Sequence, residues 1–142
     1  MADKKFKVTI ATPTGVVVDT ESESLLAPGT EGYLGILPNH APLMTGLDVG
    51  LIRYRDLDNY DHYFAVTDGF LEVSNNIVTI IADACELSAE IDLERAKQSL
   101  ERAQERLQQA STDSAIDAER ARAAVRRAKN RIEVAEKHNS NN

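Results

Sequence analysis

The same helical sequence occurs twice in the last third of this chain. Residues 91–96 read IDLERA, and residues 116–121 repeat the pattern as IDAERA. An Asp after an Ile suits a helix N-terminus, because the carboxylate accepts a hydrogen bond from a free backbone N–H while the Ile packs back onto the Ala of the first turns. The sequence therefore predicts two helices, with Asp92 and Asp117 as their N-caps.

Both predicted helices carry a narrow apolar seam. Apolar residues recur at alternating steps of three and four, which is the spacing of a two-helix seam. The linker of residues 111–114 is short and polar, so it returns the chain antiparallel as a helical hairpin. The seam consists of Leu93, Ala96, Leu100, Ala103, Leu107 and Ala110 in the first copy, and of Ala118, Ala121, Val125, Ala128, Ile132 and Ala135 in the second.

Composition changes just before the hairpin. All seven Gly, all four Pro and all seven aromatic residues lie at or before Phe70. Residues 1–90 carry five Lys/Arg against fourteen Asp/Glu, a net charge of −9, whereas residues 91–142 carry eleven against nine, a net charge of +2. We therefore predict two parts, residues 1–87 and 88–142, which bind different partner surfaces because their net charges have opposite signs. The thin seam of the second makes it the more mobile part.

The first part reads as many short strands separated by turn residues. Phe6, Val8 and Ile10 alternate with polar neighbours, as expected of a half-buried strand. Eight to ten such strands predict an antiparallel β-sandwich or flattened barrel, so the whole chain is predicted to be α+β. Further predicted strands are Val16–Val18, Ser24–Leu26, Tyr33–Ile36, Leu51–Tyr54, Tyr63–Val66, Phe70–Val73 and Ile77–Ala82, with tight turns at Pro13–Gly15, Asp68–Gly69 and Ser74–Asn76.

The sequence offers no signal for export, membrane insertion or catalysis. Its first residues lack an apolar segment, and no run approaches the roughly 20 apolar residues that span a bilayer, so a soluble or peripheral protein is expected. Cys85 lies in an apolar strand pattern and is interpreted as a buried thiol in a reducing compartment. No P-loop occurs, and His40 has no Cys, second His or Ser/Asp at catalytic spacing. The scattered carboxylates Asp56, Asp58 and Asp61 read as a solvated loop, so we predict that the chain is not an enzyme.

A rigid loop interrupts the strand pattern at residues 29–43. It holds three Gly and two Pro within fifteen residues, with apolar side chains between them. Such a loop turns a sheet corner or meets a partner. Two roles stay open for His40: bracing the loop, and contacting a partner.

The order of motifs along nearly the whole chain resembles the epsilon subunit of bacterial F-type ATP synthase. The resemblance lies in GYLGILPNHAPL at residues 32–43, VGLIR at 49–53, GFLEV at 69–73 and the repeated Ile-Asp-x-x-Arg-Ala hairpin. It implies a noncatalytic rotor subunit of a proton-translocating enzyme. In that family the sandwich binds the gamma subunit and the c ring. The hairpin regulates ATP hydrolysis, and its extended form contacts the catalytic alpha and beta subunits.

The resemblance also implies which residues meet the partners. The loop of Glu31, Gly32 and Tyr33 matches the family's c-ring contact, and His40 is the other candidate contact. Some relatives have an acidic residue at the central position, so Tyr33 implies a packing or hydrogen-bonded contact in place of a salt bridge. The implied location is the cytoplasmic face of the bacterial membrane, reached only through the complex, and nucleic acid is not an expected partner.

The resemblance further implies an ATP site in the hairpin, where ATP, with or without Mg²⁺, is a regulatory ligand. The implied site residues are Glu86, Ile91, Asp92, Arg95, Ala96, Arg102, Arg127 and Arg131. Arginines from both helices suit phosphate because their planar donors form strong charge-assisted hydrogen bonds.

Three alternatives stay open at this stage. The second copy, residues 116–121, satisfies the same six-residue motif. The arginines also fit a solvated face that pairs with Glu94, Glu101, Glu105 and Glu119. Finally, the chain fits an adaptor whose hairpin binds a protein helix without nucleotide.

Overall fold

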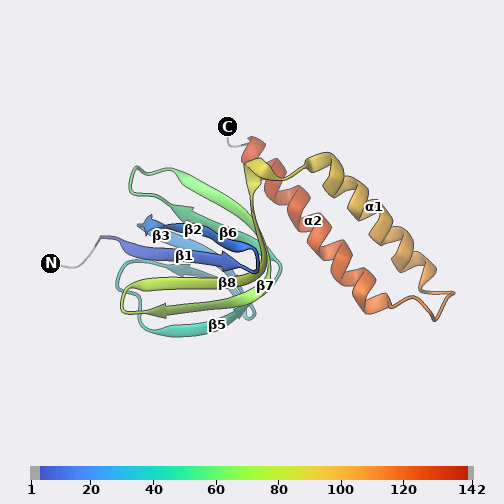
Figure 1. The fold of residues 1–142 in the computed structure, drawn as a ribbon, viewed down its shortest axis with the longest axis horizontal. Coiled ribbons are helices and arrows are strands. Elements are labelled where there is room, and N and C mark those ends of the chain that lie inside the picture. The colour runs from blue at the N-terminus through green and yellow to red at the C-terminus, as the bar shows by residue number, and fades with distance from the viewer. Residues whose placement is uncertain (1–3, 141–142) are drawn as a thin grey trace. The chain divides into compact units, whose positions relative to one another are not determined.

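The N-terminal part of the chain folds into eight β-strands (Figure 1). The computed structural model describes residues 4–140, with side chains up to residue 137. The strands are β1 (Phe6–Thr12), β2 (Gly15–Ser22), β3 (Ser24–Gly29), β4 (Gly32–Ile36), β5 (Leu43–Leu47), β6 (Gly50–Arg55), β7 (Asp61–Ser74) and β8 (Ile77–Leu87).

The strands pair in the order β2-β1-β8-β7-β5-β3-β4, and β6 pairs with both β3 and β7. All pairs are antiparallel except β1 with β8, which is parallel. A parallel pair needs a long connection, and most of the domain lies between these two strands. The predicted β-sandwich is thus confirmed, with one parallel pair inside it.

The core follows the predicted alternation. Phe6, Val8 and Ile10 of β1 are buried, as are Val78 and Ile80 of β8. The residues between them in β1 and β8 face outward or are less buried, as the pleat requires, whereas β7 buries Phe64, Ala65 and Val66 in succession. The turn at Asn75 and Asn76 is also confirmed, since both residues have positive φ angles, 52° and 62°.

Two features of the strands differ from the prediction. Leu43–Leu47 forms β5, which the sequence did not indicate. The predicted turn at Asp68 and Gly69 is wrong, because β7 runs through both residues. Gly69 is needed there for close packing: a Cβ at this position would lie 2.2 Å from the carbonyl oxygen of Ile81. A Gly inside a strand can mark such a close backbone approach instead of a turn.

The C-terminal part is a short 3₁₀ turn followed by an antiparallel helical hairpin. The turn is η1 (Ser88–Glu90), and the helices are α1 (Leu93–Gln109) and α2 (Ala118–Ser140), which lie side by side in Figure 1. Apart from Val134, the buried residues of the two helices are alanines: Ala96, Ala103, Ala121, Ala128 and Ala135. The predicted hairpin and its thin, alanine-rich seam are both present.

The chain divides into two compact units, Met1–Leu87 and Ser88–Asn142. Within the described residues, neither helix combines the length and apolar character that a membrane crossing requires.

Candidate functional site

The first motif copy builds the start of α1. Asp92 is its N-cap, and its Oδ1 accepts a hydrogen bond from the backbone N–H of Arg95 at 3.0 Å. Ile91 and Ala96 are buried, whereas Arg95 is exposed. The predicted cap is confirmed. Because one carboxylate oxygen of Asp92 is occupied by the helix, the other remains for a ligand.

The remaining residues of the predicted nucleotide site come from three elements. Arg102 of α1 is exposed, and its Nη2 donates to Ser99 Oγ at 3.3 Å. Arg127 and Arg131 are half-buried on α2. Glu86 is half-buried on β8, in the other compact unit. The hairpin itself thus supplies the predicted arginines of both helices.

The second motif copy lines a cavity of about 480 Å³ between the two helices. Its Asp117 accepts a hydrogen bond from the backbone N–H of Arg120 at 3.2 Å, as the predicted cap of α2. Of the predicted nucleotide residues, only Arg127 lines this cavity. The complete lining is Ala103, Arg106, Ala115, Ile116, Asp117, Arg120, Ala121, Ala124 and Arg127.

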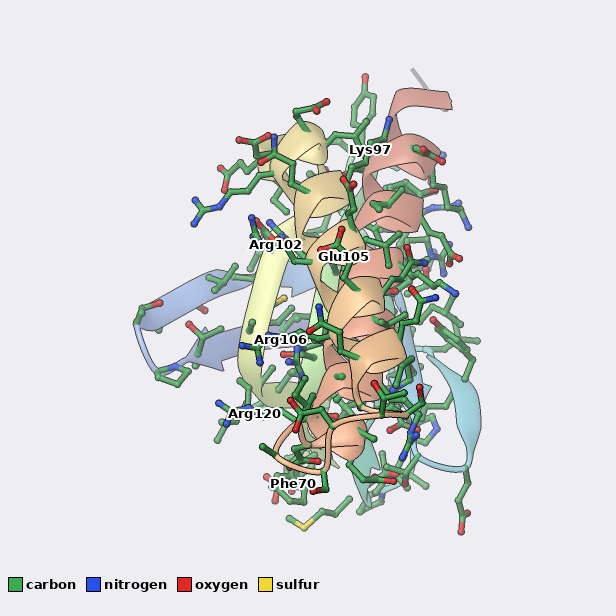
Figure 2. The ribbon with its side chains drawn as sticks, turned by 90° about the vertical axis from the view of Figure 1, so that its right-hand side faces the viewer. Phe70, Lys97, Arg102, Glu105, Arg106 and Arg120 are labelled. Atoms are coloured by element: carbon green, nitrogen blue, oxygen red, sulfur yellow. The ribbon has the colours of Figure 1, made fainter. Side chains whose placement is uncertain are left out.

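Arg106 and Arg120 line this cavity but were not among the predicted nucleotide residues; Arg120 belongs to the second motif copy, which the sequence left open as an alternative. Arg102, Arg106 and Arg120 lie along the same side of the hairpin in Figure 2. The signal for Arg106 was its position one helical turn after Arg102, and the signal for Arg120 was its place in the second motif copy.

The charge around this cavity is not balanced. Arg106, Arg120 and Arg127 have no side-chain hydrogen bond or ion pair within the part of the chain that the structure describes. Asp117 is the only carboxylate in the lining, so the cavity carries a net formal charge of +2. Of the glutamates considered as arginine partners, Glu119 pairs with Arg122 at 2.7 Å. Arg106 and Arg120 are exposed to solvent, and Arg127 is half-buried.

The predicted partner residues of the sandwich lie at two different ends of it. Glu31 and Gly32 form the tip between β3 and β4, next to the end of β5, because Thr30 N–H donates to Gly46 O at 3.0 Å. His40 lies before the start of β5, where Asn39 N–H donates to Asn76 Oδ1 at 2.7 Å. The structure therefore does not bring His40 together with the tip of Glu31, Gly32 and Tyr33.

His40 has the geometry of a loop brace. Its Nδ1 lies 2.7 Å from the carbonyl oxygen of Ala41, and its backbone N–H donates to Leu37 O at 3.2 Å. Both bonds stay within the loop between β4 and β5, and they hold the imidazole beside its own backbone.

A row of exposed apolar side chains crosses the outer face of the sheet. Phe70 of β7 pairs directly with Ile81 of β8, and Ile81 pairs with Ala11 of β1, which pairs with Val16 of β2. The exposed fractions of Phe70, Ile81 and Val16 are 66%, 60% and 66%. We call Val16, Phe70 and Ile81 the apolar row. Large apolar side chains that stand together in solvent mark an interaction surface.

Among residues 4–137, no group of three or more His, Cys, Asp or Glu side chains is arranged to hold a metal ion.

Comparison with known proteins agrees with this architecture. Residues 5–88 match the beta-sandwich domain of the ATP synthase delta/epsilon chain, and residues 89–136 match the long alpha-helix domain of the same chain. The ATP synthase epsilon chain of Carboxydothermus hydrogenoformans is 49% identical over 107 residues, which is 75% of this chain and 78% of that one. The epsilon chain of Pelotomaculum thermopropionicum is 46% identical over 107 residues, or 75% and 79% of the two chains.

Solved structures share the fold. A chain in the cryo-EM structure of the Euglena gracilis mitochondrial ATP synthase superposes with a TM-score of 0.82 at 20% identity, covering 96% of this chain and 84% of that one. A chain of the Tetrahymena thermophila mitochondrial central stalk and c ring gives a TM-score of 0.57 at 16% identity, with coverages of 97% and 98%. With both domains matched in order and close bacterial relatives along most of its length, this chain belongs to the ATP synthase delta/epsilon family and resembles its bacterial epsilon chains.

Proposed function

We propose that this chain is the noncatalytic rotor subunit that joins the gamma subunit to the c ring of a bacterial, proton-translocating F-type ATP synthase. Family membership supports a role in the central stalk. The related Euglena and Tetrahymena structures contain a c ring, together with F1 in the first and the central stalk in the second. In this proposal the chain lies at the cytoplasmic face of the membrane, held there by the complex.

The apolar row is the observation that carries the partner-binding part of this proposal. These three side chains become buried only when a partner covers them. Burial of apolar area favours association by a free energy of about 25 cal/mol per Å². We assign the row to gamma and the tip of Glu31, Gly32 and Tyr33 to the c ring. Tyr33 is 56% exposed, which leaves its ring free for packing.

A binding experiment with the gamma subunit tests the assignment of the apolar row. Phe70→Glu and Ile81→Glu should each weaken binding at least tenfold, because a partner would then bury an unpaired charge. Leu57→Glu is the matched control, since Leu57 is also exposed, at 48%, but lies in the loop between β6 and β7. Equal binding by all three variants, with circular dichroism showing intact folds, would place gamma elsewhere.

The hairpin is proposed to be a regulatory switch. Its seam is mostly alanine, so little apolar area favours the folded arrangement over an extended one. A ligand that binds only the folded form shifts the balance by its differential affinity. We propose ATP as this ligand, bound by the first motif copy together with Arg102, Arg127 and Arg131. The extended hairpin, which carries the arginine excess of the chain, would contact acidic surfaces of the alpha and beta subunits.

Deletion of residues 88–142 tests the regulatory role in the assembled complex. The truncated complex should hydrolyse ATP faster than the intact one, because the brake is absent. Unchanged hydrolysis, with the subunit content confirmed, would show that the hairpin does not restrain the enzyme.

Calorimetry on the full-length subunit tests the ATP ligand. Arg102→Ala and Arg127→Ala should each weaken ATP binding by about tenfold to a hundredfold, the effect of losing one charge-assisted hydrogen bond. Arg122→Ala is the control, because Arg122 already pairs with Glu119. Unaltered ATP affinity in both test variants would rule out the proposed nucleotide site at the first motif copy.

The adaptor alternative has a separate test. Purification of the tagged chain from membranes should recover gamma and the c ring if the rotor proposal holds. Recovery of an unrelated helical protein without either of them would favour the adaptor.

A further inference from the structure

The cavity beside the second motif copy has the composition of an anion site. It lies between α1, the connecting turn and the start of α2, so a ligand inside it would touch all three segments. Its space comes from small side chains, since four of the nine lining residues are alanines. A volume of about 480 Å³ falls within the usual range for small-molecule sites, about 300–1,000 Å³.

The arginines that line the cavity lack protein partners. Arg106 comes from α1, whereas Arg120 and Arg127 come from α2, so the positive charges converge from both helices. These three guanidinium groups share the lining with a single carboxylate, Asp117, so an anion in the cavity would meet a net positive charge. Elsewhere on the hairpin, Arg95 and Arg126 also have no side-chain hydrogen bond or ion pair among the described residues. What distinguishes the three arginines here is that they line one cavity.

We propose that this cavity binds a phosphate-bearing anion, held by Arg106, Arg120 and Arg127, at a site separate from the first motif copy. Guanidinium groups match phosphate oxygens in geometry and charge. The cavity's net charge of +2 and its volume suit a diphosphate group better than a single inorganic phosphate. Asp117 already caps α2 through Oδ1, and it limits the positive charge that faces the ligand.

An anion bound in this cavity would hold α1 and α2 together near their connecting turn. Arg106 and Arg120 lie on opposite sides of that turn in the sequence, and an anion that both contact would attract both of them. The anion would thereby favour the folded hairpin, in the same direction as the ATP proposed at the first copy. The two proposals share only Arg127, so variants of Arg106 and Arg120 test the cavity without changing a residue assigned to the first copy.

Titration calorimetry on the full-length chain, with pyrophosphate as the probe, tests this site. Wild type should bind pyrophosphate, and Arg106→Gln and Arg120→Gln should each weaken binding by about tenfold or more, as expected for one charge-assisted hydrogen bond. Arg122→Gln is the control and should leave binding within about twofold, because Arg122 already pairs with Glu119. Glutamine is chosen because it retains helix propensity. Amide NMR shifts of Ala115, Ile116 and Ala121 provide a second measurement that does not depend on heat.

Two outcomes would overturn the proposal. One is the absence of pyrophosphate binding by wild type at millimolar concentration. The other is an equal loss of pyrophosphate affinity in the Arg122→Gln variant, which would indicate nonspecific attraction to a basic helix.

Parallel titrations with inorganic phosphate and with ATP identify the source of the phosphate group. ATP binding lost in Arg106→Gln and Arg120→Gln but retained in Arg95→Gln and Arg102→Gln would support the cavity and contradict the first-copy nucleotide site. If ATP binding is lost in Arg95→Gln and Arg102→Gln but retained in Arg106→Gln and Arg120→Gln, and pyrophosphate binding is lost in the latter two, the chain has two separate sites.

Discussion

The hydroxyl oxygen of Tyr33 accepts a hydrogen bond from the backbone N–H of Leu51 at 2.9 Å. The bond joins β4 to β6, which do not pair with each other as strands. Gly50 makes room for it, because a Cβ at that position would lie 2.7 Å from the Tyr33 hydroxyl and 2.6 Å from Pro28 Cβ. The exposed ring of Tyr33 is thus held in a fixed position beside the predicted c-ring contact.

Gly50→Ala should destabilise the sandwich by about 1–3 kcal/mol, the usual cost of overpacking, because the rigid ring of Pro28 leaves the new methyl group no space. Chemical unfolding of the full-length chain measures this loss. Gly35→Ala is the matched control on β4, since no atom lies within 4 Å of its added Cβ. A similar loss in both variants would mean that strand position, and not the contact with Pro28 and Tyr33, sets the cost.

Asp92→Ala should destabilise the hairpin by about 1 kcal/mol, because the backbone N–H of Arg95 loses its acceptor. Thermal melting followed by helical circular dichroism is the measurement. Asp92→Asn should retain most of the stability, since its side-chain oxygen can still accept the bond. Equal loss in the Ala and Asn variants would assign the effect to charge instead of capping.

Cys85 should react slowly with thiol reagents in the folded protein. It is half-buried on β8, and burial, followed by the negative charge of Glu86, raises the pKa of its thiol to about 12. At pH 8 only about one thiol in ten thousand would then be ionised, and the thiolate is the reactive form. Labelling with iodoacetamide should accelerate sharply in denaturant. Equally fast labelling of folded and denatured chains would contradict this.

The loop between β6 and β7 should lose stability in acid. The hydrogen bond from His62, at 2.8 Å, and the backbone N–H of Tyr60 hold the pKa of Asp56 below its ordinary value. The hydrogen bond from Arg55 lowers the pKa of Asp61 in the same way. A carboxylate with a depressed folded pKa stabilises the fold above the unfolded value of about 3.9, and this contribution disappears as the pH falls through the folded pKa.

Urea unfolding at pH 7 and at a series of acidic pH values checks this dependence. Asp56→Asn should lower stability at pH 7, and its difference from wild type should shrink as the pH falls through the folded pKa of Asp56. Asp58→Asn is the control, because its carboxylate has no hydrogen bond or ion pair among the described side chains. A constant difference between wild type and Asp56→Asn at all of these pH values would show that the charge of Asp56 is not responsible.

Several elements could be predicted because their signals are local. Period-two alternation located β1, turn residues bounded the predicted strand within β8, and the Ile-Asp pairs located the starts of both helices. The strand β5 was missed because its five residues include Gly46 and sit beside the Pro-rich loop, which hides the alternation. Gly69 was wrongly predicted to lie in a turn, because glycine is required both in tight turns and where two strands approach closely, as β7 and β8 do here.

The two-part architecture, the helix caps and the thin alanine seam could be predicted from local patterns, because each depends on residues close together in the chain. The order of motifs along the chain likewise indicated the family. The arginines that line the cavity and the apolar side chains that form a row could be identified only in the folded chain. Arg106 meets Arg120 and Arg127 through the alignment of two helices, and Phe70, Ile81 and Val16 meet through the register of four strands. Such alignments are fixed by packing between distant segments, so no local pattern records them.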